Sequence, residues 1–144
     1  MNIHASLFAI ANPLEMLDRL LHPHRRYATI TYRKHNLLIE LTQRARLELG
    51  KRHTPLKVEM QLYFSCVVKK RVLFHDVTEL ETTPVDDKLE IVFRLVQATS
   101  CDPVEFARDF PVKREFTSPA AKGVRPKRLA VDFYRGRWSG EFDI

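Results

Sequence analysis

The sequence predicts an α+β protein dominated by antiparallel β-sheet, and three observations carry this prediction. Apolar and polar residues alternate over several long stretches, most clearly over residues 56–68. Two other segments carry helix start signals. With 144 residues and 44% hydrophobic content, the chain has the size of one compact domain spanning residues 1–144. We expect a meander of about six long strands in a strongly curved sheet or half-open barrel, an N-terminal helix, and a short helix before a C-terminal hairpin.

Both helices are predicted from their first residues. Asn12 and Pro13 supply an N-cap and a first-turn proline, and leucines follow at helical spacing, which predicts a helix over residues 13–22. The same signal recurs at Asp102 and predicts a shorter helix that ends at Pro111.

The strands are predicted from alternation. Besides the C-terminal hairpin, they cover residues 28–32, 37–49, 56–68 and 89–95. The 56–68 strand is expected to bury one face, formed by its even-numbered residues. The 37–49 stretch also has a helix-like composition, but alternation favours a strand there.

Turns set the expected pairing of the first strands. A two-residue turn at His35 and Asn36 places Tyr32 opposite Ile39. A loop over residues 50–55 then pairs the 37–49 strand with the 56–68 strand.

The C-terminal hairpin has the strongest turn signal. A turn at Arg135 and Gly136 places Phe133 opposite Trp138 and Leu129 opposite Phe142. Gly136 suits the positive φ that such a turn requires.

The formal net charge of +6 is concentrated near the C-terminus. Eight basic and two acidic residues lie between Lys113 and Arg137, whereas the remainder holds 16 of each sign. Glycine and proline within this segment predict a mobile basic loop over residues 113–127. An acidic stretch over residues 76–90 indicates a polarised molecule.

This charge distribution predicts a site for a polyanion. Phosphate groups require several cationic donors on one surface, and arginine offers a bidentate fork. The candidate nucleic-acid-binding residues are Lys122, Arg125, Lys127, Arg128, Lys69, Lys70, Arg71, Arg25 and Arg26. A solvated loop that only confers solubility is the alternative.

Three tyrosines occupy positions that we expect to face outward. Tyr27, Tyr63 and Tyr134 could stack on bases beside the cationic side chains. The β-propensity of tyrosine accounts for the same positions without any ligand.

No metal, cofactor or catalytic pattern is present in the sequence. His22 and His24 flank Pro23 but lack the further ligands that zinc requires. Cys66 and Cys101 lack the spacing of a zinc site or redox pair, so reduced thiols and a cytoplasmic location are expected. The apolar run over residues 3–11 is too short for a membrane span.

The sequence therefore supports three functional hypotheses in order. The first is a small basic, non-catalytic protein that binds nucleic acid or another polyanion. The second is a protein-interaction module or accessory subunit, which could meet an acidic protein partner. The third is a ligand-binding β-barrel or an enzyme, and a pocket enclosed by the sheet would favour it.

Overall fold

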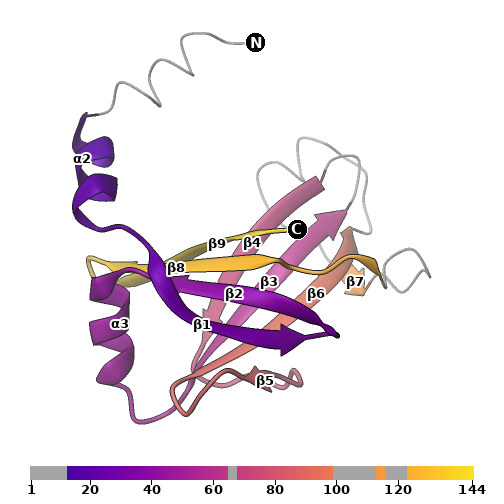
Figure 1. Ribbon diagram of the computed structural model, residues 1–144. Coiled ribbons are helices and arrows are strands. Elements are labelled where there is room, and N and C mark those ends of the chain that lie inside the picture. Colours follow the sequence, from indigo (N-terminus) through magenta and orange to yellow (C-terminus); the bar gives the residue numbers. More distant parts are fainter. Residues whose placement is uncertain (1–12, 65–67, 99–112, 116–122) are drawn as a thin grey trace, which may run out of the picture.

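The computed structural model describes residues 13–64, 68–98, 113–115 and 123–144, and within them two β-sheets pack against each other (Figure 1). Two helices accompany the sheets, α2 (Pro13–Leu21) and α3 (Gln43–Gly50). Three predicted features lie outside the described residues: the helix ahead of Pro111, the two cysteines and Lys122.

The first sheet has four strands in the order β1-β2-β8-β9. Their bounds are Arg25–Tyr32 for β1, His35–Leu41 for β2, Arg128–Tyr134 for β8 and Arg137–Asp143 for β9. The pairs β1–β2 and β8–β9 are antiparallel hairpins, whereas β2 and β8 run parallel.

The second sheet has five strands in the order β4-β3-β6-β5, with β7 also paired to β6. Their bounds are Leu56–Phe64 for β3, Val68–His75 for β4, Thr83–Pro84 for β5, Leu89–Ala98 for β6 and Lys113–Glu115 for β7. Only β3 and β6 run parallel in this sheet. The fold is therefore α+β with mostly antiparallel pairing, and the described strands do not close into a barrel.

The hydrophobic core lies between the two sheets. Phe93 of β6 and Phe142 of β9 meet edge to face, with 5.9 Å between their ring centroids. Burial of each large apolar side chain contributes about 1.5–3 kcal/mol. The large core side chains that are almost completely buried include Leu37, Ile39, Leu41, Leu56, Met60, Leu89, Ile91 and Leu129.

The sheets approach closely where β4 lies beside β9. A Cβ atom on Gly140 would lie 3.2 Å from side-chain atoms of both Phe74 and Val72, so the absence of a side chain permits this contact. Lys70 Nζ donates a hydrogen bond to the carbonyl oxygen of Phe142 at 3.0 Å. On another side, the tip of the β1–β2 hairpin reaches β6, because the Phe93 amide donates to the Tyr32 hydroxyl at 2.9 Å.

The C-terminal hairpin confirms its predicted register. Phe133 pairs with Trp138 and Leu129 with Phe142, and Gly136 has a φ of 77° in the turn. The predicted turn of the first hairpin is wrong by two residues: it lies at Arg33 and Lys34, and Ile30 pairs with Leu37. Tyr32 therefore pairs with His35 rather than with Ile39, a register shift of four residues. An even shift leaves the same side chains on the buried face, so alternation alone could not distinguish the two registers.

The strand predicted over residues 37–49 is also incorrect in its second half. β2 ends at Leu41, and Thr42 then caps α3 by accepting the Ala45 amide on its side chain. Ala45 and Leu49 are four residues apart and both are buried, which is the spacing of one helical face. The predicted pairing of 37–49 with the 56–68 strand is therefore wrong, since β3 lies between β4 and β6.

β3 confirms most of the strand predicted over residues 56–68, but not its C-terminal end or its single buried face. Val68 belongs to β4 and pairs with Phe64, so the predicted strand is too long. Glu59, Gln61 and Tyr63 alternate with the core residues and are also buried. The outward position predicted for Tyr63 is therefore wrong. A central strand with neighbours on both edges lies deep in its sheet, and here both of its faces are shielded from solvent.

Candidate interaction surface

The predicted cationic residues do not form one uninterrupted positive surface in the part of the chain that the structure describes. Arg128 forms ion pairs with Glu40 and with Asp143, the latter at 3.3 Å, and its Nη1 lies 3.9 Å from Glu141. The hydrogen bond to Glu40 raises the pKa of Arg128 above its usual value. Its charge is thus balanced by carboxylates on both neighbouring strands.

The three cationic residues of β4 divide between two faces. Lys70 pairs with Leu62 and reaches β9, where its ammonium lies 5.7 Å from the Phe142 ring centroid. Arg71 pairs with Gln61, and its Nε donates to the Gln61 side-chain oxygen at 2.7 Å. Burial lowers the pKa of Arg71. Lys69 lies on the same face as Arg71, because alternate residues of a strand share a face.

The predicted basic loop is bound to the sheets at both described ends. Lys113–Glu115 forms β7 and pairs with β6. Lys127 is exposed, but its backbone amide donates to Asp143 at 2.7 Å and its carbonyl accepts the Leu38 amide at 3.0 Å. Arg125 donates to the carbonyl oxygen of Gly123 at 3.3 Å.

Arg25 and Arg26 open β1, and the structure adds a third arginine to them. Arg46 of α3 donates to the Arg26 carbonyl oxygen at 3.0 Å and lies over the ring of Tyr27. All three arginines are exposed, and none forms an ion pair with another described residue. We call Arg25, Arg26 and Arg46 the basic cluster.

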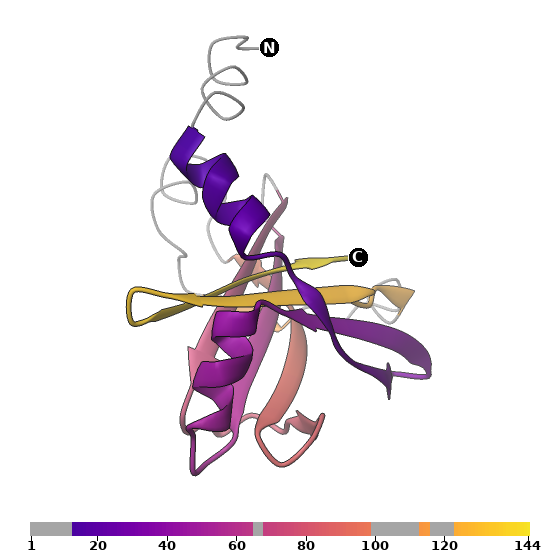
Figure 2. The ribbon, with the colours of Figure 1, turned by 60° about the vertical axis from the view of Figure 1, so that its left-hand side comes forward.

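A second feature lies directly before this cluster. α2 projects beyond the two sheets, as the views in Figures 1 and 2 agree, and none of its residues is buried. Its large apolar side chains are 46–78% exposed. They lie on one side of the helix, which we call the docking face: Leu14, Met16, Leu17, Leu20 and Leu21.

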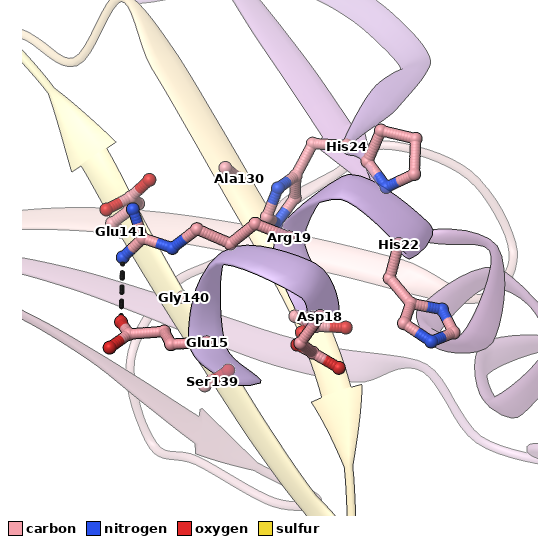
Figure 3. A pocket seen from close by; sticks show the side chains of 11 residues that line it. Glu15, Asp18, Arg19, His22, His24, Ala130, Ser139, Gly140 and Glu141 are labelled. Carbon is pink, nitrogen blue, oxygen red and sulfur yellow. Dashed lines mark hydrogen bonds and ion pairs between the residues drawn. The ribbon is translucent and has the colours of Figure 1, made fainter. Parts of the chain in front are cut away.

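The opposite side of α2 is polar and faces the body of the protein. A cleft of about 490 Å³ separates it from the outer surface of β8 and β9 (Figure 3). Within the cleft, Arg19 pairs with Glu15 at 3.1 Å. The helix contributes Glu15, Asp18 and Arg19 to the lining but no leucine, so the docking face is turned away from the sheets.

Arg44 fixes α2 to the body through two aspartates. Its Nη1 and Nη2 donate to the two Asp18 carboxylate oxygens at 3.0 and 2.9 Å. Its Nε and Nη2 donate to Asp132 of β8 at 2.8 and 2.7 Å. We call Asp18, Arg44 and Asp132 the Arg44 clamp.

The surroundings of the clamp favour its charged form. Burial acts to raise the pKa of Asp132, but hydrogen bonds from Arg44 and Thr42 outweigh burial and lower this pKa to about 2. The hydrogen bond from Arg44 likewise lowers the pKa of Asp18. The clamp therefore stays ionised at neutral pH and holds α2 by charge rather than by apolar packing.

Glu59 is the most deeply buried carboxylate in the described chain. It accepts hydrogen bonds from Gln61, from His75 at 2.9 Å and from Arg94 at 3.2 Å. Burial alone would raise the pKa of Glu59, but these donors lower it. A carboxylate held by three donors serves as a fixed structural anion, and no group of possible metal ligands occurs among the described residues.

Tyr27 and Tyr134 also make contacts within the protein. The Tyr27 hydroxyl donates to Asp86, and burial together with this carboxylate raises the pKa of Tyr27. Tyr134 is 48% exposed, and Arg44 lies over its ring at 4.4 Å. Both rings therefore already stack with arginines of this chain.

Sequence reasoning identified Arg25, Arg26 and the amphipathic character of α2, but it missed Arg44, Arg46 and Asp132. Both of the missed arginines lie in the segment interpreted as a strand. No helix among the described residues is long and apolar enough to cross a membrane. No family model, curated protein or solved structure matches this chain.

Proposed function

We propose that this chain is a non-catalytic interaction module that binds another protein through the docking face of α2. The observation that carries the proposal is the exposure of five large apolar side chains on a helix whose polar side is attached to the body. Exposed apolar patches of this kind mark interaction sites. A helix that inserts its apolar side into a groove is a common mode of protein recognition.

The energetics support a partner rather than a purely structural role for α2. A nine-residue helix is too short to be stable alone in water, and this one buries no residue of its own. Transfer of a leucine from solvent into an apolar groove is worth about 1.5–3 kcal/mol. Occupation of the docking face would therefore stabilise both the complex and the helix. On the sequence grounds given above, we expect this binding to take place in the cytoplasm.

A photo-crosslinker tests this proposal and captures the partner in the same experiment. p-Benzoylphenylalanine replaces Leu20 on the docking face, and crosslinking in cells is measured. The control carries the same group in place of Val77, which is 86% exposed but distant in sequence from α2. The captured protein is then purified and titrated against the wild type, Leu17→Glu and Val77→Glu. We expect Leu17→Glu to weaken binding at least about tenfold and Val77→Glu to leave it unchanged.

Two results would overturn the proposal. One is equal crosslinking from both positions, and the other is equal affinity of the Leu17→Glu variant and the wild type. Because Leu17 is 52% exposed, its substitution leaves the core intact, and circular dichroism checks that the variants fold.

A second candidate function is binding of a polyanion by the basic cluster. Its support is the exposure of three guanidinium groups without a carboxylate partner in the described chain. Fluorescence anisotropy with a labelled 20-nucleotide single strand tests it at low salt. We expect alanine at Arg25, Arg26 and Arg46 to weaken binding more than alanine at Lys34, Lys51 and Arg137, which are exposed and carry the same total charge elsewhere. Absence of binding by the wild type at low salt would exclude this function.

A further inference from the structure

The docking face and the basic cluster follow each other along the chain. Only His22, Pro23 and His24 separate the end of α2 from Arg25. The chain that leaves the C-terminal end of the helix thus leads directly into the basic cluster, whereas carboxylates on the polar side of α2 face the cleft and the Arg44 clamp.

The size of the docking face argues against a second copy of this chain as its occupant. A nine-residue helix is about 13 Å long. Two such helices side by side would bury only a few hundred Å², below the roughly 1,000 Å² of a stable interface. The cleft beside α2 would add little to such a dimer, because it lies on the opposite side of the helix from the docking face and is lined in large part by charged groups such as Glu15, Asp132 and Glu141. A concave groove covers more of one helix than a second convex helix can.

We infer that the partner is a protein with an apolar groove bordered by carboxylates at the end that receives the C-terminus of α2. The apolar floor would contact the leucines of the docking face, and the carboxylates would pair with the arginines of the basic cluster. This inference rests on the proposed function and specifies its ligand. Charges at the border of an interface act mainly on orientation and association rate, so they would fix the direction of the helix in the groove.

Titrations over a range of salt concentrations separate this inference from the proposed function. The captured partner is titrated against the wild type, Leu17→Glu, and a variant with Arg25, Arg26 and Arg46 changed to glutamate. A variant with Lys34, Lys51 and Arg137 changed to glutamate is the matched control, because it alters net charge equally.

The expected results differ for the two features. Leu17→Glu weakens binding at every salt concentration. The basic-cluster variant binds about tenfold more weakly at low salt and approaches the wild type at high salt, since exposed charge pairs are screened. The control variant stays within about threefold of the wild type at all salt concentrations.

Three results would overturn the inference. If the basic-cluster variant matches the wild type while Leu17→Glu fails to bind, the acidic border is excluded but the proposed function stands. If light scattering of the purified chain shows a dimer that Leu17→Glu dissociates, the occupant is a second copy. If the wild type floats with phosphatidylserine vesicles and Leu17→Glu does not, the occupant is a membrane surface.

Discussion

The two helices in the described part of the chain, α2 and α3, are similar in length but are held in opposite ways. α3 buries Ala45 and Leu49 against the core and is capped by Thr42. α2 buries no residue, and its described hydrogen bond to the body comes from the Arg44 side chain. An amphipathic helix can thus have its apolar side directed to solvent when an ion pair attaches its polar side to the body. We interpret α3 as part of the scaffold and α2 as the part that binds.

Truncation of apolar side chains should affect the free energy of unfolding very differently in the two helices. Leu49→Ala should lower the free energy of unfolding by about 2–5 kcal/mol, because it leaves a cavity beside the core. Leu17→Ala should change it by less than about 0.5 kcal/mol, because Leu17 is exposed. Urea denaturation of both variants measures the difference. Similar losses from both substitutions would show that α2 packs on the body, contrary to this account.

The next effect tests the clamp through pH. The pKa of Asp132 is about 2 in the folded protein and 3.8 for an unperturbed carboxyl. The ionised carboxylate therefore stabilises the folded protein above about pH 4, and this stabilisation is lost as pH falls towards 2. Asp132→Asn should therefore lower stability by about 2 kcal/mol at neutral pH, and the difference should shrink below pH 4. Urea titrations from pH 7 to pH 2 measure it. Asp87→Asn is the control, and a difference that is independent of pH would contradict the ionic role.

A smaller effect concerns the first turn of α3. The Thr42 hydroxyl accepts the Ala45 amide at 3.2 Å and donates to Asp132 at 2.6 Å. Thr42→Ala should lower stability by about 1 kcal/mol. Thr42→Ser keeps the hydroxyl and should therefore lose only a small part of that stability. Thermal unfolding followed by circular dichroism compares the two. Equal losses from both variants would show that the methyl group, rather than the cap, matters.

The smallest effect is local to α2. Asp18→Ala should increase amide exchange in α2 by up to about fivefold, because the ion pair of Asp18 with Arg44 is only partly buried and contributes about 1 kcal/mol or less. Exchange in α3 should not change. Hydrogen exchange with mass spectrometry resolves the two helices. Unchanged exchange in α2 would show that another contact holds this helix.

Local signals predicted some elements of the fold well. The β8–β9 hairpin was predicted in full, because alternation and the turn glycine agree. α2 was predicted because its start signals and leucine spacing agree. The 37–49 segment shows where such signals fail: alternating leucines fitted a strand, but the Thr42 cap and the burial of Ala45 with Leu49 favour a helix.

Non-local contacts could not be predicted in the same way. β4 was missed because the cationic run Lys69, Lys70 and Arg71 interrupts the apolar alternation in the first half of the strand. Only Val72 and Phe74, after this run, show the alternation. β3 and β6 pair in parallel although they are not consecutive strands. Alternation shows that a segment is a strand but does not show which other strand lies beside it. The clamp joins Arg44 to residues 26 and 88 positions away, so it became visible only in three dimensions.

We propose that the docking face is open in the isolated protein and covered by a partner in the cell. Hydroxyl-radical footprinting at natural expression levels tests it directly, since Met16 is 46% exposed and methionine oxidises readily. We predict strong oxidation of Met16 in the purified protein and protection in cells, while Tyr134, which is 48% exposed, reacts equally in both. Equal oxidation of Met16 in both settings would contradict the account.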